Sequence, residues 1–411
     1  MLARQGRVTV GAPNESDLRS PAVQVRSYEG SRMATLVSDH DVVVAFGYLL
    51  RQHPLIARQA RFLVMDLYDP FLLENLTMHD DLPMARRMGV HEHDLGVVRD
   101  QLRQADFFIC ASERQRDYWL GALSMVNRVN PQSYAQDATL RRLIDVVPFG
   151  LPAEPPAPAR PAIREEVAAI AADDIVVLWG GGIWNWFDPL TAIRAVASLR
   201  AEVPGLKLFF LGLRHPNPEL PQMAMARRAV ELATELRVLD HQVFFRHGWV
   251  PYEDRVNYLM SADIGISLHF EHVETRFSYR TRLLDYIWTG LPVVATAGDV
   301  LSNELAAAGA GIAVPEGDVS AVADALRRLA KDPGARSSMG ERARRLAADH
   351  TWERVAVPLL EYCRSPYRNR EAGALDLDAP GLSQRLRASW WRSPVRRAAG
   401  KIRRRLRGRR P

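Results

Sequence analysis

The residues best suited to chemistry lie between Glu274 and Thr296. Ser278 is a favoured helix N-cap and Gly290 a favoured helix end, so the sequence predicts a helix over residues 279–289. At about 100° per residue, the apolar residues of this segment fall on one side of the helix. The opposite side carries four polar residues, Ser278, Thr281, Arg282 and Asp285.

Those polar groups suit a phosphate or diphosphate ligand. Hydroxyl groups, a guanidinium and free backbone N–H groups meet at a helix N-terminus, and Arg276 and Arg280 lie beside them in the chain. Asp285, one turn further along, has the chemistry to accept hydrogen bonds from sugar hydroxyls. The competing interpretation is a solvated helix face on which Arg282 pairs with Asp285. Helical spacing alone leaves both interpretations open.

Two further loops in this half of the chain follow predicted strands. The loop over residues 179–188 contains three glycines, of which Gly181 and Gly182 are candidates for close backbone approach to a ligand. Trp184 in the same loop is a further candidate for ligand binding, with core packing as the alternative role for the aromatic residues. Arg214 directly follows the next predicted strand and completes this set.

Two acidic residues follow a strand in the first half of the chain. Asp66 and Asp69 come directly after the apolar residues 62–65. Their carboxylates are candidates for binding acceptor hydroxyls or for proton transfer. A turn-and-cap role is the alternative interpretation.

Short apolar strands alternate with helices through most of the chain, and this alternation must position those loops. It predicts an α/β protein with parallel sheets covered on both faces, in which ligands bind at the C-terminal ends of the strands. Before the first such strand, the sequence predicts a strand over residues 7–10 and then a polar, irregular segment to residue 39. Another helix is predicted from residue 95 to residue 105.

A proline-rich stretch divides the chain. Residues 152–161 contain five prolines, a composition that stays extended and resists packing. We therefore expect an N-terminal domain over residues 1–151, a linker over 152–162, a C-terminal domain over 163–370 and a separate tail over 371–411.

Composition limits the function classes. The apolar and charged fractions are those of a globular protein, and neither an apolar run of 18 residues nor a signal-peptide core is present, so a cytoplasmic protein is expected. Cys110 and Cys363 lie in apolar runs and are predicted to be reduced core residues. His91 and His93 have a spacing that a metal could use, but a solvated connector is the favoured interpretation. No metal site and no cofactor are expected.

The tail differs from the rest of the chain in charge. Residues 384–411 carry twelve Arg or Lys residues and no Asp or Glu, whereas the whole chain has a net charge of only +6. Two tryptophans and spaced apolar residues among these cations are typical of a segment that binds an anionic membrane surface. Nucleic acid binding and a solvated, disordered tail are the competing interpretations.

At this point the sequence resembles a known family, the family-4 glycosyltransferases of the GT-B fold. The resemblance is most specific from about Val176 to Cys363. It is carried in the second half by residues 277–296, 311–326 and 350–356, and in the first half by residues 66–70, 110–119 and 147–150. It implies two doubly wound Rossmann-like domains that face each other across a cleft, followed here by the basic tail. The C-terminal domain would bind a nucleotide-diphosphate sugar, and the sugar would pass with retention to an acceptor on the N-terminal domain.

The resemblance also implies roles for individual residues. Asp285 stands where the family has the acid that contacts the nucleotide ribose, and Glu274 would lie near the donor sugar. The diphosphate would be bound by Ser278, Thr281 and Arg282.

The sequence departs from the family pattern at four places. The family's first acid is replaced by Phe277, and its usual Arg and Lys after the first C-domain strand are missing, so we expect Arg214, Arg276 or Arg280 to neutralise the leaving group. The family's N-domain histidine is replaced near Tyr68. A strand, a glycine-rich loop and a helix that begin the family's N-terminal domain are also missing, for which a misassigned start codon is the favoured explanation.

The sequence therefore predicts a retaining glycosyltransferase of cell-surface polysaccharide assembly, acting on a glycan or lipid-linked acceptor. We expect it in the cytoplasm, on the inner face of the membrane through residues 384–411, and without nucleic acid. The alternatives are an inactive GT-B module that binds a nucleotide sugar and, through the tail alone, a nucleic-acid-binding protein.

Overall fold

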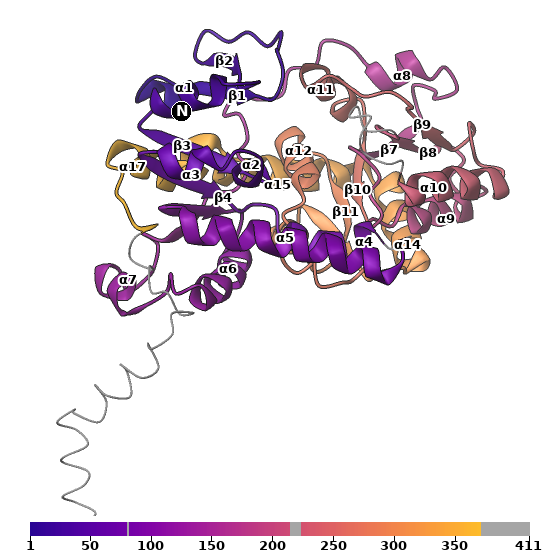
Figure 1. Ribbon diagram of the computed structural model, residues 1–411. Coiled ribbons are helices and arrows are strands. Elements are labelled where there is room, and N and C mark those ends of the chain that lie inside the picture. Colours follow the sequence, from indigo (N-terminus) through magenta and orange to yellow (C-terminus); the bar gives the residue numbers. More distant parts are fainter. Residues whose placement is uncertain (80–81, 214–222, 371–411) are drawn as a thin grey trace, which may run out of the picture.

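Two parallel sheets lie side by side, each flanked by helices (Figure 1). The computed structural model describes residues 1–79, 82–213 and 223–370. Within those residues, no helix has both the length and the apolar character needed to span a bilayer. The predicted α/β fold with parallel sheets is confirmed.

The first sheet has four strands in the order β3-β4-β5-β6, all parallel. One face packs on a core that includes Trp119 and Leu123 of α6 and Val97 of α5. The strands are β3 (Val42–Phe46), β4 (Phe62–Asp66), β5 (Phe107–Cys110) and β6 (Ile144–Val146), and the helices are α2 (Leu49–Gln52), α3 (Leu55–Gln59), α4 (Phe71–Met78), α5 (Met84–Gln104), α6 (Glu113–Met125) and α7 (Pro131–Gln136).

Strand β3 forms one edge of this sheet. Val44 and Phe46 on it are 41% and 70% exposed, whereas Leu63, Val64 and Met65 on the neighbouring strand are fully buried. The first sheet therefore presents apolar side chains to solvent at this edge.

The N-terminal segment differs from its prediction. Strand β1 (Thr9–Ala12) pairs in parallel with β2 (Gln24–Ser27) in a separate two-stranded sheet, and α1 (Arg32–Ser38) follows. The prediction of an irregular segment up to residue 39 was therefore wrong. Both strands are short and mostly exposed, so their residues lack the apolar runs that reveal buried strands.

Helix α5 is also longer than the sequence predicted. It spans Met84–Gln104, so it begins well before the predicted start at residue 95 and contains His91 and His93. The favoured interpretation of these histidines as part of a connector was wrong. The N-terminal part of α5 is polar and largely exposed, which leaves little helical hydrophobic period to detect.

The second sheet has six parallel strands in the order β12-β11-β10-β7-β8-β9. Buried side chains fill both of its faces, with Leu326 of α14 on one side and Leu283 of α12 on the other. The strands are β7 (Ile175–Trp179), β8 (Leu206–Phe210), β9 (Val243–Phe245), β10 (Ile264–Ser267), β11 (Val293–Thr296) and β12 (Gly311–Val314), and the helices are α8 (Ala162–Glu166), α9 (Pro189–Ser198), α10 (Ala224–Glu235), α11 (Arg255–Leu259), α12 (Thr281–Thr289), α13 (Val300–Ala307), α14 (Val319–Lys331) and α15 (Pro333–Ala347).

After α15 the chain returns to the first sheet through α16 (Trp352–Val355) and α17 (Val357–Arg364). Tyr362 of α17 stacks on Phe107 of β5 with ring centroids 4.7 Å apart. Arg370 forms an ion pair of 2.8 Å with the fully buried Asp106. The predicted C-terminal unit, residues 163–370, thus includes a terminal segment that packs on the first sheet.

Candidate functional site

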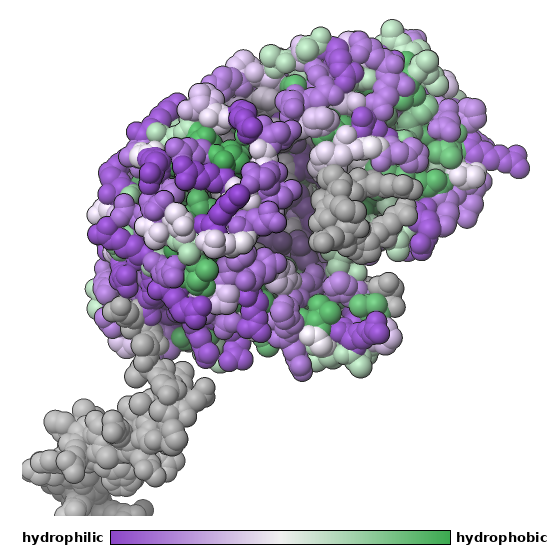
Figure 2. All heavy atoms as spheres, turned by 45° about the horizontal axis from the view of Figure 1, so that its top comes forward, coloured by the Kyte–Doolittle hydropathy of each residue, from purple (hydrophilic) through white to green (hydrophobic). Residues whose placement is uncertain are grey.

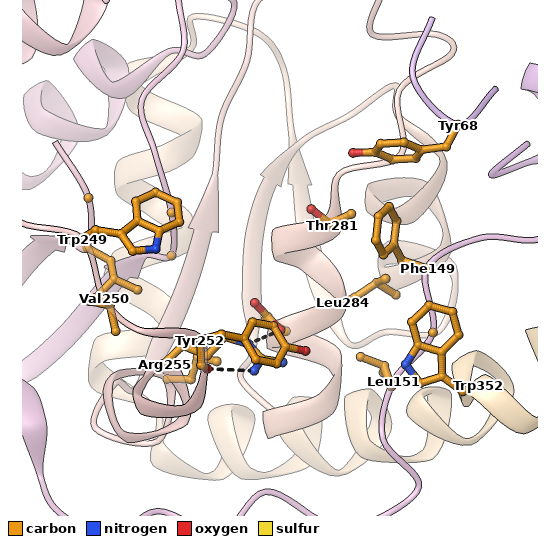
Figure 3. A pocket seen from close by; sticks show the side chains of 17 residues that line it. Tyr68, Phe149, Leu151, Trp249, Val250, Tyr252, Arg255, Thr281, Leu284 and Trp352 are labelled. Carbon is orange, nitrogen blue, oxygen red and sulfur yellow. Dashed lines mark hydrogen bonds and ion pairs between the residues drawn. The ribbon is translucent and has the colours of Figure 1, made fainter. Parts of the chain in front are cut away.

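A pocket of about 480 Å³ lies where strands of the second sheet end, next to the N-terminal half of α12. Figure 2 shows the surface hollowed between the two lobes of the molecule. In Figure 3, Trp249 and Val250 stand on one side of the pocket, Tyr68, Phe149 and Trp352 on the other, and α12 between them. The lining residues are Tyr68, Phe149, Gly150, Leu151, Gly180, Gly181, Leu211, Gly212, Trp249, Val250, Tyr252, Arg255, Leu259, Thr281, Leu284, Asp285 and Trp352.

Of the four polar residues predicted to face a ligand from α12, only two line this pocket. Its apolar side is buried as predicted, with Leu283 and Ile287 inaccessible, and Gly290 ends the helix at a φ of 71°. On its polar side, Thr281 and Asp285 line the pocket.

The prediction that Ser278 caps this helix was wrong. The helix begins at Thr281 after Arg280, with no side-chain cap, and Ser278 Oγ instead donates to the carbonyl of Thr275 at 3.0 Å. A tight turn explains the difference, because the N–H of Phe277 donates to the carbonyl of Glu274 and commits Ser278 to that turn. No side chain therefore caps the first backbone N–H groups of α12.

Asp285 forms an ion pair with Arg255, another residue that lines the pocket. Arg255 Nε donates to Asp285 Oδ1 at 3.3 Å, and the Arg255 guanidinium lies 3.7 Å from the centre of the Tyr252 ring. Burial raises the pKa of Asp285, while the charge and hydrogen bond of Arg255 lower it. The alternative pairing of Asp285 with Arg282 is not formed, because Arg282 turns the other way.

Arg282 lies beneath the glycine loop rather than in the pocket. Its guanidinium packs between Trp179 and Phe187, at 4.9 and 4.2 Å from the ring centres, and Nη2 donates to the carbonyl of Gly182 at 2.8 Å. Burial lowers the pKa of Arg282 to about 10. Nη1 is buried without a hydrogen-bond partner among the described residues, so its two N–H bonds remain available beneath the loop.

The glycine loop is shaped by its own backbone and by Tyr286. Gly181 has a φ of 135°, which glycine adopts readily, and both Gly180 and Gly181 line the pocket. The N–H of Gly180 donates to the Tyr286 hydroxyl at 2.7 Å. Gly182 does not line the pocket, and its carbonyl accepts the bond from Arg282 instead.

Trp184 takes the packing role that was its alternative interpretation. Its ring stacks on Trp186 with centroids 5.4 Å apart, and it packs against the core of the second sheet. It does not line the pocket.

Glu274 forms a buried ion pair outside the pocket. Only 1% of its side chain is exposed, and Arg280 Nη2 donates to its Oε2 at 2.7 Å. The Arg280 guanidinium also lies 5.0 Å from the centre of the Phe187 ring. Arg276 lies exposed on the same loop, and Arg214 lies outside the described residues.

Asp66 and Asp69 belong to a group of carboxylates at the end of β4. Asp66 Oδ1 accepts from the N–H of Tyr68 at 3.0 Å, and burial raises the pKa of Asp66 to about 6. Asp69 is exposed at the surface, yet partial desolvation by the surrounding protein raises its pKa; a hydrogen bond to Glu74 lowers it, and the charge of Glu274 from the other half of the chain raises it. Asp69 therefore lies near the second half, next to Tyr68, which lines the pocket.

Sequence reasoning missed several members of the site. Glu74 on α4 has a pKa well above its usual value, first because of burial and then because of Asp69 and Glu274. Trp249 and Tyr252 line the pocket from the segment after β9. Two aromatic residues in a segment between a strand and a helix are a sequence pattern that could have pointed to this part of the pocket. Phe149 and Trp352 come from the two crossings between the sheets, which no local pattern identifies.

The cysteines and histidines show no metal-site geometry. Among the residues that the structure describes, no group of three His, Cys, Asp or Glu side chains is placed to hold a metal ion. Cys110 is a buried free thiol, as predicted, and Cys363 is a half-buried one.

Comparisons with known proteins agree with this architecture. Residues 195–361 match the glycosyl transferase-like family. The D-inositol 3-phosphate glycosyltransferase of Saccharomonospora viridis is 28% identical over 223 residues, which are 54% of this chain and 49% of that protein. The chain spans about half the length of the curated relatives it matches.

Two solved structures share the fold over most of the chain. Sucrose-phosphate synthase from Thermosynechococcus elongatus has a TM-score of 0.62 at 19% identity, over 88% of this chain and 90% of that one. The Anabaena protein HepE, in complex with UDP and glucose, has a TM-score of 0.58 at 16% identity, over 84% and 86%. The chain therefore has the GT-B fold, and residues 195–361 of its second half are similar to the glycosyl transferase-like family.

Proposed function

We propose that this protein is a retaining glycosyltransferase that takes its sugar from a nucleotide-diphosphate donor. The observation that carries the proposal is the pocket beside α12, which combines an uncapped helix N-terminus, a glycine loop and a carboxylate. A helix N-terminus attracts a diphosphate, and a carboxylate accepts hydrogen bonds from ribose hydroxyls. The Anabaena structural neighbour holds UDP and glucose, which supports a ligand of this class.

The pocket suggests how the nucleotide would lie. We assign the ribose to Asp285 and the base to the aromatic side formed by Trp249 and Tyr252. The diphosphate would then reach the start of α12 at Thr281, opposite Gly180 and Gly181. The donor sugar would extend toward Tyr68 and the carboxylates of the first half.

The chemistry would depend on positioning and charge. In a retaining transfer the leaving phosphate itself can take the acceptor proton, so the protein aligns the two substrates and stabilises the developing charge. The N–H groups of α12 and the buried cation Arg282 supply positive charge near that position, whereas Glu274 compensates the charge of Arg280. Because these groups neutralise the diphosphate, we expect transfer without an added metal ion or cofactor.

The acceptor and location follow from the sequence rather than from the described residues. We propose a glycan or lipid-linked acceptor bound on the side of Asp66 and Asp69, in cell-surface polysaccharide assembly. The protein would act on the cytoplasmic face of the membrane through residues 384–411, which lie outside the described residues.

Donor binding is tested by thermal-shift titration of the full chain with UDP-, GDP- and dTDP-sugars. One of these should raise the melting temperature with saturation, as expected when a ligand binds only the folded state. Asp285→Ala should weaken that ligand about 10- to 100-fold, which is about 1.4–2.7 kcal/mol. Asp173→Ala, at an exposed position before β7 that does not line the pocket, is the matched control and should leave the affinity unchanged. A chain that binds no nucleotide sugar and releases no nucleotide from one would overturn the proposal.

A second candidate is a module that binds the nucleotide sugar without transferring it. It is favoured by one observation: Phe277 occupies the place of the family's first acid, and the nearby Glu274 is committed to Arg280. Release of the nucleoside diphosphate from the bound donor separates the two candidates, because a binding module would shift the melting temperature and release none.

A further inference from the structure

One buried side chain joins the two halves of the protein at the site. Gln115, on α6 of the first half, is fully buried. Its Nε2 donates to the carbonyl of Tyr68 at 2.7 Å and to the carbonyl of Phe277 at 2.8 Å. Its Oε1 accepts from the N–H of Ala111 at 2.8 Å, which fixes the orientation of the amide.

The two carbonyls belong to the two sides of the proposed reaction. Tyr68 lies in the turn after β4, between Asp66 and Asp69, and its side chain lines the pocket. Phe277 lies in the loop that leads into α12 and therefore into the uncapped helix N-terminus. A single amide group thus fixes the position of the acceptor-side turn relative to the donor-side loop.

Other contacts of α6 reinforce this connection. The ring of Tyr118 lies 5.1 Å from that of Phe277, and Trp119 Nε1 donates to the carbonyl of Leu67 at 2.9 Å. Arg114 Nη1 donates to the carbonyl of Gly298 at 2.6 Å, but this bond is exposed. Buried hydrogen bonds are costly to lose, because each orphaned group keeps its desolvation penalty of about 1–3 kcal/mol. Gln115 is therefore the strongest polar link in this set.

We propose that Gln115 is a positioning residue that aligns the acceptor turn with the donor loop. The proposal rests on the proposed function and adds a determinant of its transfer step. The side-chain hydrogen bonds of Gln115 to the described residues all go to backbone groups, so it acts through Tyr68 and Phe277 rather than on a substrate. A misplacement of about 1 Å between two reacting groups can slow a reaction about 100-fold, so loss of this link should act mainly on kcat.

The proposal also gives Phe277 a role. At the position where the resembled family has an acid, this chain has a residue whose carbonyl and ring both contact α6. The position is used here for contact between the halves.

The experiment compares wild-type protein with Gln115→Leu and Gln115→Glu. Glutamate keeps the size and the acceptor for Ala111 but removes both donated bonds, and Gln132→Leu replaces an exposed glutamine as the control. The donor is whichever UDP-, GDP- or dTDP-sugar stabilises the wild-type chain most. Turnover is measured with water and with a panel of monosaccharides as acceptors.

Both Gln115 variants should lower kcat for transfer to a monosaccharide about 10- to 100-fold, with the donor KM within about threefold of wild type. Hydrolysis by water should fall much less, because water needs no fixed acceptor turn. A purely structural defect would instead lower both reactions together with the melting temperature. An unchanged ratio of transfer to hydrolysis in both folded variants would overturn the proposal, whereas a wild-type chain that binds and turns over no nucleotide sugar would overturn the proposed function and this inference with it.

Discussion

The two halves of the protein offer different means of recognition. In the second half, a six-stranded sheet buried on both faces carries a pocket whose polar part is a glycine loop, a helix N-terminus and Asp285. In the first half, a four-stranded sheet with an exposed edge carries a group of carboxylates with raised pKa values. Backbone N–H groups are fixed by the fold and keep their charge distribution at every pH. Side-chain carboxylates change with pH and with what binds beside them.

Under the proposed function, this difference would make the donor side rigid and the acceptor side adjustable. A diphosphate is common to all nucleotide-sugar donors and can be recognised by a fixed backbone. Acceptors differ in their hydroxyl arrangement, for which carboxylates that gain or lose a proton are well suited. Substitutions at Tyr286, Asp66 and Phe46 test the difference between the two halves.

The largest effect is expected at the support of the glycine loop. Tyr286 is fully buried, and its hydroxyl accepts from the N–H of Gly180 and donates to the carbonyl of Leu178 at 2.8 Å. Tyr286→Phe would leave these backbone groups without the hydroxyl and should lower the free energy of unfolding by about 3 kcal/mol. Urea denaturation measures this loss, and donor affinity should fall with it. Tyr134→Phe, at a residue that is 59% exposed, is the control. If the two variants are equally stable, the loop does not depend on this hydroxyl.

A smaller and pH-dependent effect is expected at Asp66. Because burial raises its pKa from 3.8 to about 6, the folded chain binds this proton more tightly than the unfolded chain does. The resulting stability is present below pH 4 and is lost as the pH rises through 6. Asp66→Asn removes the loss, so the variant should gain about 2 kcal/mol over wild type between pH 4 and pH 8.

Denaturation of both proteins at several pH values measures this difference. The raised pKa values of Asp69 and Glu74 affect both proteins, so the comparison isolates Asp66. A difference that does not change with pH would mean that folding leaves the pKa of Asp66 unchanged, which would contradict the contrast between the halves at this residue.

The smallest effect is expected at the exposed edge. Phe46→Lys replaces a side chain that is 70% exposed, and such surface changes alter stability by no more than about 0.5 kcal/mol. The added charge should also raise the concentration at which the protein begins to associate, since charged edge strands resist pairing. A loss of several kcal/mol by the same denaturation assay would show that Phe46 is covered in solution.

The local features of the fold could be predicted from the sequence. Buried strands such as β4, β5 and β7 are continuous apolar runs, and α12 has an apolar side and a glycine at its end. Each of these patterns spans only a few residues, so each can be recognised without knowledge of the rest of the chain. A pocket lies beside α12, where we expected the site, since parallel strands gather their C-terminal ends at one edge.

The prediction failed where a polar group meets a partner far away in the chain. Arg282 lies next to Gly182, which is 100 residues earlier, and Gln115 bonds to Phe277, which is 162 residues later. Helical spacing correctly put Arg282 on the polar side of α12, but it could not say that a glycine loop would cover this side chain. Ser278 has a side chain suited to capping the helix, but its hydroxyl bonds to the carbonyl of Thr275 instead.

Local sequence patterns were therefore enough to predict the parallel sheets, the position of α12 and the type of chemistry that its N-terminus can support. Which side chains reach the pocket, which ones pack behind it and how Gln115 connects its two sides all depend on how the whole chain packs. Hydrophobic period and glycine conformation act over neighbouring residues. The partner of a buried polar group is set by the packing of segments that are distant in the chain.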